Sequence, residues 1–183
     1  MTASDNNAEP TIRLATEDDI PTILQFIHDL ASYEDSTHKV EATPTTLLHT
    51  LSFPSSPAKT AGTYTALITP PPTDSNPHPI PVGMALYFYN YSTWRAAPGV
   101  YLEDFYVEEK YRGCGYGRRL FEWLAREVKR VGGGRLEWSV LKDNYPSIKF
   151  YEKMGGVVGE EWMKMSVDRE ALDRLAEGKG GKE

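Results

Sequence analysis

Residues 101–120 read YLEDFYVEEKYRGCGYGRRL, a stretch that runs from a strand through a glycine-rich turn into a helix. Leucine, valine and aromatic residues up to Val107 predict the strand. Gly113, Gly115 and Gly117 allow positive φ angles and close approach of a ligand to the backbone. The helix that follows presents unpaired N–H groups and a partial positive charge at its N-terminus, so the stretch indicates a pyrophosphate-binding site.

The glycine pattern alone has other interpretations. A Walker A loop requires GxxxxGK[ST], which is absent. A dinucleotide fingerprint requires GxGxxG within an early βαβ unit, with an acidic residue about 20 positions further on. Neither the spacing nor the position past the middle of the chain fits that pattern. A flexible turn without a ligand is the third alternative.

Hydrophobic periodicity and turn residues on both sides of this stretch predict an alternation of strands and helices. The glycine cluster at 132–134 ends the helix whose apolar face contains Leu120, Leu124 and Val128. Strands are expected at 11–14, 63–68, 82–91, 100–107 and 136–141 and within 157–167, and helices at 20–33, 44–51, after the glycine loop, at 146–154 and at 169–176. This order implies an α/β fold with a central mixed sheet and helices on both faces.

The 183 residues are sufficient for one domain, which we place at residues 11–176. Residues 1–10 are small and polar and are expected to be a disordered tail, and residues 177–183 a mobile tail. Residues 70–81 hold six of the 13 prolines. Because proline cannot donate to a sheet ladder, we interpret this segment as a proline-rich hairpin insertion.

Charge and composition restrict the partners and the compartment. The net charge is −6 and there is no long basic run, which argues against nucleic acid as a partner. No apolar stretch reaches the ~18–20 residues of a membrane span, and the first ten residues lack the basic and apolar regions of a signal peptide. One cysteine, Cys114, excludes an intramolecular disulfide, so we expect the cytoplasm, with the nucleus as an alternative. The four histidines lack metal-ligand spacing, so no metal is expected.

Two segments resemble the GCN5-related N-acetyltransferase (GNAT) superfamily. They are residues 101–120, with R-G-C-G-Y-G at 112–117, and residues 144–156, NYPSIKFYEKMGG. Residues 30–34, 87–94 and 101–104 are similar to the diamine acetyltransferases, the subfamily of spermidine/spermine N1-acetyltransferase and thialysine N-ε-acetyltransferase. The resemblance implies a mostly antiparallel GNAT sheet, acetyl-CoA as co-substrate, a small amine as acceptor and a homodimer. Ser92 stands where the subfamily often has an acidic residue, and the insertion at 70–81 is a second departure.

The resemblance also implies where acetyl-CoA binds. Its pantetheine arm is expected to pair with the strand before the loop, and its pyrophosphate to lie on the loop. A further face comes from Asn144, Ser147 and Tyr151, whose spacing of i, i+3 and i+7 places them on one side of a helix. The expected cofactor-binding residues are Phe105, Tyr106, Val107, Arg112, Gly113, Cys114, Gly115, Tyr116, Gly117, Arg118, Asn144, Ser147 and Tyr151.

Glu103 and Asp104 interrupt an apolar strand, where strict alternation would direct their side chains to opposite faces. The resemblance favours Glu103 as the base that takes a proton from the attacking ammonium through water. Asp104 is expected to be a second anionic contact or a structural partner. The alternative for both is a structural ion pair or a half-exposed strand. Tyr151 is the expected general acid for the departing thiolate. Taken alone, Tyr151 is better interpreted as a core aromatic residue beside Phe150, and the face it shares with Asn144 and Ser147 favours the catalytic role instead.

Tyr33, Glu34 and Trp94 are candidate contacts for the acceptor amine, together with Glu103 and Asp104. Glu34 follows a helix and can bind an ammonium group, and Trp94 can provide a cation–π contact. The alternatives are a solvated acid and an interface aromatic residue. Two other functions stay open: acetylation of protein lysines or N-termini, and CoA binding without catalysis.

Overall fold

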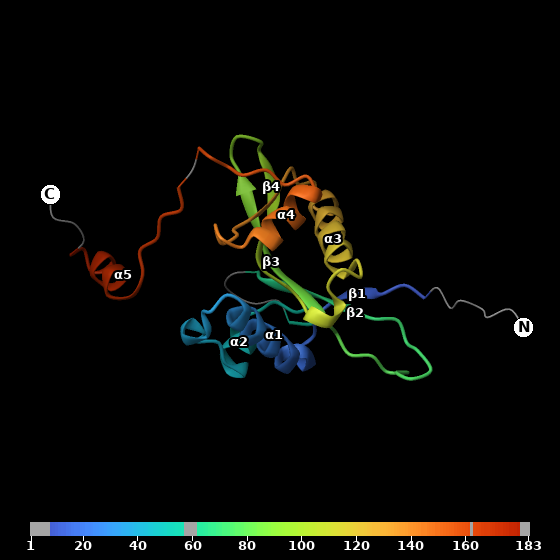
Figure 1. Ribbon diagram of the computed structural model, residues 1–183. Helices are drawn as coiled ribbons and strands as arrows, with labels where there is room; N and C mark the ends of the chain where they lie inside the picture. The colour runs from blue at the N-terminus through green and yellow to red at the C-terminus, as the bar shows by residue number, and fades with distance from the viewer. Residues whose placement is uncertain (1–7, 57–61, 162, 180–183) are drawn as a thin grey trace, which may run out of the picture. The chain divides into compact units, whose positions relative to one another are not determined.

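The computed structural model describes residues 8–56, 62–161 and 163–179. The chain divides into two compact units, Met1–Leu141 and Lys142–Glu183. The first unit contains the sheet and the helices that pack on it (Figure 1). The prediction of one domain at 11–176 stays a prediction.

Five strands in the described part of the first unit form one sheet. They are β1 (Thr11–Leu14), β2 (Tyr64–Thr69), β3 (Gly83–Ser92), β4 (Ala97–Val107) and β5 (Leu136–Trp138). The strands lie in chain order, and each pair from β1 to β4 is antiparallel. Only β4 and β5 are parallel. The predicted mixed, mostly antiparallel sheet is therefore confirmed.

Helices cover both faces of this sheet, as predicted (Figure 1). The first unit contains α1 (Ile20–Tyr33), α2 (Pro44–Thr50) and α3 (Tyr116–Arg130), together with short 3-10 turns η1 (Glu17–Asp19), η2 (Thr37–Lys39) and η3 (Glu109–Tyr111). On the α1 face, Ile23, Phe26 and Leu47 join Met84 and Leu86 in a buried core. On the other face, α3 buries Phe121 together with Leu120, Leu124 and Val128, the three named residues of the predicted apolar face.

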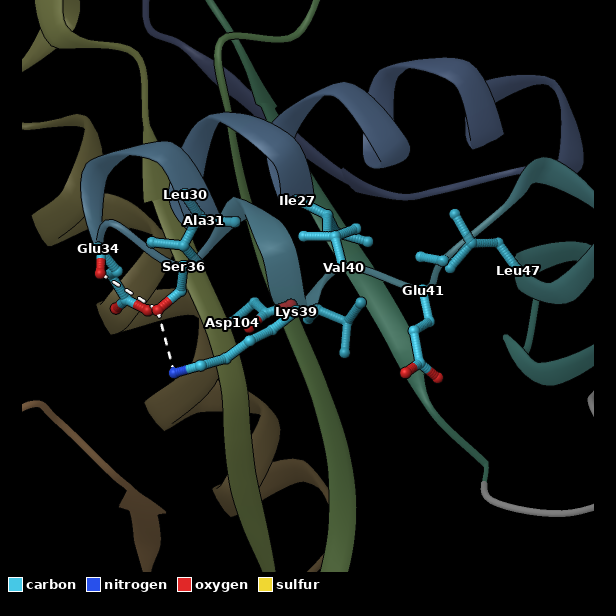
Figure 2. Close-up of a pocket in the computed structure, with 12 residues that line it drawn as sticks. Ile27, Leu30, Ala31, Glu34, Ser36, Lys39, Val40, Glu41, Leu47 and Asp104 are labelled. Atoms are coloured by element: carbon cyan, nitrogen blue, oxygen red, sulfur yellow. Dashed lines mark hydrogen bonds between the residues drawn. The ribbon is translucent and has the colours of Figure 1, made fainter. Parts of the chain in front are cut away.

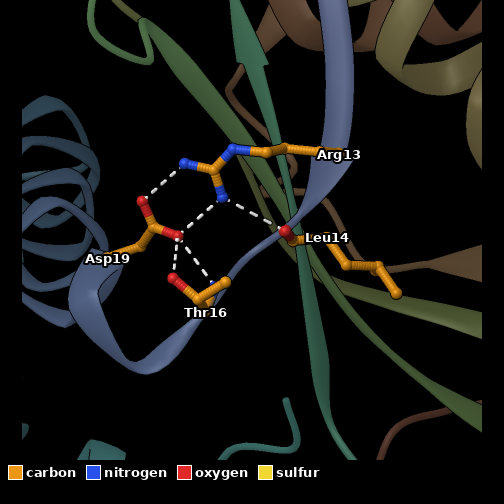
Figure 3. Close-up of polar contacts among 4 residues, drawn as sticks. All are labelled: Arg13, Leu14, Thr16 and Asp19. Atoms are coloured by element: carbon orange, nitrogen blue, oxygen red, sulfur yellow. Dashed lines mark hydrogen bonds and ion pairs between the residues drawn. The ribbon is translucent and has the colours of Figure 1, made fainter. Parts of the chain in front are cut away.

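The start of α1 is fixed by a polar cluster around the buried Asp19 (Figure 3). The guanidinium of Arg13 donates to both Asp19 carboxylate oxygens, at 2.7 and 2.8 Å. The backbone N–H of Thr16 donates to the same carboxylate at 2.8 Å, as in a capping box. The hydrogen bonds from Arg13 and Thr16 lower the pKa of Asp19, although burial opposes them. The cluster anchors β1 to α1.

The second unit contains α4 (Tyr145–Lys153) and α5 (Arg169–Ala176). Both helices were predicted, and α5 has the predicted bounds. The strand expected within 157–167 is wrong for the described residues of that segment, which have no regular structure. Val157 and Met165 are among the exposed residues there. A strand requires a neighbour for its backbone hydrogen bonds, and none of the described residues of the second unit forms a strand.

No helix among the described residues is long and apolar enough to cross a membrane.

Candidate active site

A β-bulge in β4 falls at the two acidic residues. Leu86 lies opposite Asp104 and Tyr87 lies opposite Leu102, so Glu103 has no partner on β3. Because Leu86 and Tyr87 are neighbours on one strand, Leu102 and Asp104 face opposite sides of the sheet. The strict alternation assumed for Glu103 and Asp104 is therefore wrong at this point. The bulge directs the side chain of Asp104 toward α1 and leaves Glu103 exposed.

The edge of β4 becomes accessible just after the bulge. Its parallel pairing with β5 ends at Leu102 and Trp138, whereas β4 continues to Val107. None of the β4 residues from 103 to 107 pairs with β5. Unpaired N–H and C=O groups on such an edge can accept an extended ligand as an added strand. This edge includes Phe105, Tyr106 and Val107, the residues predicted to receive the pantetheine arm.

The glycine loop joins this strand to α3 by way of η3. Gly113 and Gly115 have φ angles of 77° and 86°, in the left-handed region. A Cβ atom at either position would meet nothing within 4 Å, so the backbone conformation, and not crowding, requires glycine here. Gly115 is the N-cap of α3, and no side chain caps the helix. The first N–H groups of α3 are thus oriented to bind an anion.

Three arginines surround the loop. Arg112 donates from Nε to the carbonyl oxygen of Val107 at 3.0 Å, and its guanidinium lies 4.9 Å from the Tyr33 ring centroid. Tyr106 lies on the same guanidinium at 5.8 Å. Tyr33 therefore contacts the loop arginine. Its predicted role in amine binding stays a prediction.

The other two arginines form ion pairs on the surface. Arg118 pairs with Glu122 at 2.7 Å. Arg119 pairs with Glu9 at 2.8 Å, a residue of the segment predicted to be a disordered tail. Both arginines lie in the first turn of α3, where these two carboxylates offset part of their charge.

The remaining loop residues have different surroundings. Cys114 is exposed, and its Sγ lies 3.7 Å from the carbonyl oxygen of Arg112. Tyr116 is buried and packs on Tyr111, with 5.5 Å between the ring centroids. Gly117 follows in the first turn of α3. The loop therefore presents mainly backbone groups to a ligand.

A pocket of about 390 Å³ lies on the α1 side of β4 (Figure 2). Its lining contains two predicted residues, Glu34 from the end of α1 and Asp104 from the bulge. Lys39 and Glu41 also line it and were not predicted. Apolar side chains complete the lining: Ile27, Leu30, Ala31, Val40, Ala42, Leu47 and Leu86. The charged run at 34–41 was the sequence signal that could have located Lys39 and Glu41.

The pocket favours a positive charge. Burial raises the pKa of Asp104 to about 6, and the neighbouring charges of Glu103 and Glu34 contribute to the shift. Burial also raises the pKa of Glu34, and the Lys39 ammonium partly offsets this effect. A nearby cation lowers the pKa of such a carboxyl group, because an opposite charge stabilises its ionised form. An ammonium group in the pocket would therefore be stabilised.

Trp94 does not join this group. It is 87% exposed in the turn between β3 and β4. The turn adjoins Ala97, and Asp104 lies seven residues further along β4. At about 3.3 Å per residue the two ends are separated by ~23 Å, and Trp94 does not line the pocket. Trp94 therefore lies apart from Glu34 and Asp104, and its predicted cation–π contact with the amine stays a prediction.

The second unit carries Asn144, Ser147 and Tyr151. Asn144 is the N-cap of α4, and its side-chain oxygen accepts from the Ser147 N–H at 3.3 Å. Ser147 and Tyr151, four residues apart, share a helix face and are half-buried. The Tyr151 ring packs on Phe150, with 5.3 Å between the centroids. The role of these residues in acetyl-CoA binding and acid catalysis stays a prediction.

No group of three or more His, Cys, Asp and Glu side chains in the described part of the chain is arranged to hold a metal ion.

The mostly antiparallel sheet with an open β4 edge, the glycine loop and the uncapped N-terminus of α3 together define the fold and its candidate site. Residues 61–156 match the acetyltransferase (GNAT) family. The chain belongs to this family and is an N-acetyltransferase.

Several relatives resemble almost the whole chain. The L-ornithine N5-acetyltransferase of Arabidopsis thaliana is 31% identical, over 90% of this chain and 86% of the relative. The thialysine N-ε-acetyltransferase of Mus musculus is also 31% identical, over 92% of this chain and 98% of the relative. These similarities bear out the resemblance to the diamine acetyltransferases.

Solved structures show the same fold. An integron cassette protein from the mobile metagenome of V. cholerae has a TM-score of 0.72 at 21% identity, covering 93% of this chain and 99% of its own. An aminoglycoside acetyltransferase from a soil metagenome has a TM-score of 0.66 at 14% identity, covering 88% of this chain and 97% of its own.

Proposed function

We propose that this enzyme transfers the acetyl group of acetyl-CoA to the primary amine of a small cationic molecule, by direct attack in a ternary complex. The observation that carries the proposal is that the bulge of β4 lies next to both parts of the site. The open edge of β4 and the glycine loop follow the bulge along the chain, and the pocket with Glu34 and Asp104 lies beside it on the α1 face of the sheet. One strand therefore serves the acyl donor and the acceptor.

The residues of the first unit fit acetyl-CoA. Its pyrophosphate would lie on the backbone from Gly113 to Arg118, where the N–H groups of α3 and nearby guanidinium groups complement the negative charge. The peptide-like pantetheine arm would pair with the β4 edge at Phe105–Val107. Acetyl-CoA supplies a thioester, an activated acyl group that an amine can attack.

The chain's residues would then move two protons. The acceptor enters as an ammonium ion, and Glu103 takes its proton through a water molecule, which makes the nitrogen nucleophilic. A main-chain N–H of β4 polarises the thioester carbonyl while the C–N bond forms. The C–S bond breaks, Tyr151 protonates the departing thiolate, and the second proton lost by the amine nitrogen returns to the Tyr151 oxygen. Asp104 and Glu34 hold the cationic substrate in the pocket.

The size of the pocket fits a small molecule. Its volume of about 390 Å³ lies within the range of small-ligand sites. The names of the relatives support the same class, because two of them act on ornithine and thialysine, which are amino acids with an amine at the end of the side chain.

A panel of acceptors tests the proposal. Polyamines, diamines, diamino acids, amino sugars and lysine peptides are incubated with acetyl-CoA, and the released thiol is followed. We expect turnover with one or more small amines and little with peptides. Thiol release with peptides alone would contradict the proposed substrate class. An acetylated enzyme residue, such as acetyl-Cys114, trapped in a burst phase would contradict direct transfer.

A further inference from the structure

The pocket beside the bulge contains charges of both signs. Glu34, Glu41 and Asp104 are its acids, and Lys39 is its base. A pocket that bound only polycations would gain nothing from a lysine, because the ammonium group repels the ligand. The presence of Lys39 therefore points to a substrate that carries a negative charge as well as its amines.

Lys39 is positioned at this pocket by a short polar chain (Figure 2). It is the last residue of η2, and its Nζ donates to the Ser36 hydroxyl at 3.3 Å. The Ser36 hydroxyl in turn donates to the backbone oxygen of Glu34 at 3.2 Å. The Lys39 ammonium also acts on the Glu34 carboxylate. One hydrogen bond to a hydroxyl leaves the ammonium with the capacity to donate to a further acceptor.

Apolar side chains line the same cavity. Ile27, Leu30, Val40, Leu47 and Leu86 come from α1, α2, β3 and the segment between the helices. A short methylene chain suits such a lining, with its polar ends directed to the charged residues. Two ammonium groups and one carboxylate on a methylene chain would match the acids and the single base of the pocket.

We propose that Lys39 is a specificity-determining residue that binds the α-carboxylate of an α,ω-diamino acid and so selects it over a diamine of equal length. The proposal rests on the proposed function. The α-carboxylate would bind the Lys39 ammonium, and the α-ammonium on the same carbon would have Glu34, which lies beside Lys39, as its partner. The ω-amine would lie toward Asp104. A diamine lacks the carboxylate, so the Lys39 ammonium would face only the positive charges of the ligand.

The test compares L-ornithine with 1,4-diaminobutane, which differ only in the carboxylate. The ratio of their kcat/KM values is measured for the wild type, for Lys39→Met and for Lys39→Glu. Lys129→Met, on the exposed end of α3, is the matched control. We expect the wild type to prefer ornithine. Lys39→Met should reduce that preference about tenfold by lowering kcat/KM for ornithine, which corresponds to the loss of one charge-assisted hydrogen bond near the surface. Lys39→Glu should favour the diamine, and the control should retain the wild-type ratio.

The methyl ester of ornithine provides a second measurement on the substrate side. The ester keeps both amines and removes the negative charge, so it should behave like the diamine and be insensitive to Lys39→Met. A wild type that prefers the diamine, or a Lys39→Met enzyme that loses equal activity on both substrates, would overturn the assignment. A wild type without turnover on any small amine would instead refute the proposed function.

Discussion

Removing the charge of Asp104 should make the protein more stable and the enzyme less effective. In the folded chain, burial and the charges of Glu103 and Glu34 raise the pKa of Asp104 from 3.8 to about 6. A raised carboxyl pKa means that the folded state binds the proton more tightly than the unfolded state. The wild type is therefore penalised as the pH rises from about 4 through 6, where the carboxyl group must ionise.

The size of this penalty follows from the two pKa values. A difference of about 2.2 units at 1.36 kcal/mol per unit gives at most about 3 kcal/mol above pH ~7. At about pH 5 the same two values give only about 1.5 kcal/mol, and below about pH 4 the penalty vanishes. Asp104→Asn keeps the shape of the side chain and removes the charge, so its stability relative to the wild type should grow over this range.

Urea unfolding at about pH 5 and about pH 8 measures the effect through the free energy of unfolding. Asp74→Asn, at an exposed position between β2 and β3, is the control and should stay within about 0.5 kcal/mol of the wild type. In parallel, Asp104→Asn should raise KM for the acceptor amine. A variant that is less stable than the wild type, or equally stabilised at both pH values, would refute the electrostatic reasoning.

Four further predictions concern the loop, the two proton carriers and the anchor of α1. Gly115→Val should lower acetyl-CoA affinity at least tenfold, because a β-branched residue cannot readily hold a φ of 86°. Gly132→Val introduces the same strain at the other end of α3 and is the control, for which calorimetric titration should show normal acetyl-CoA binding. Normal binding in both variants would refute the assignment of the glycine loop to acetyl-CoA binding. Tyr151→Phe should reduce kcat by about 10²-fold or more while acetyl-CoA binds normally, and full activity would exclude Tyr151 as the acid. Glu103→Gln should shift the pH optimum upward, and an unchanged pH–rate profile would argue against Glu103 as the base. Asp19→Ala should lower the free energy of unfolding by about 2–3 kcal/mol at neutral pH, since it leaves the donors of its cluster unsatisfied. That loss should shrink as the pH falls through the lowered pKa of Asp19, and a loss that is equal at low pH would contradict the assigned contacts.

Local patterns predicted most of the secondary structure. The apolar periodicity before Tyr33 and after Tyr116 located α1 and α3. These features depend on interactions within a few residues of the chain. The strand expected within 157–167 was wrong because β-propensity alone does not provide a neighbouring strand.

Part of the site could likewise be predicted from local sequence, and part could not. The glycine loop could be predicted because its positive φ angles and the following helix N-terminus are encoded next to each other in the sequence. The pocket could not. Lys39 and Glu41 acquire their meaning only when the segment between α1 and α2 folds over β4 beside Asp104. The separation of Trp94 from this pocket likewise depends on the length of the β3–β4 hairpin.

The sequence by itself determined the family, the phosphate-binding loop and the presence of two adjacent carboxylates at 103 and 104, because each is a matter of residue type and short spacing. Only the tertiary structure decided how those carboxylates are used. The bulge removes Glu103 from the pairing with β3, directs Asp104 to the pocket under α1, and follows the end of the β5 pairing. A one-residue shift between strands depends on packing across the sheet, and no local pattern specifies it.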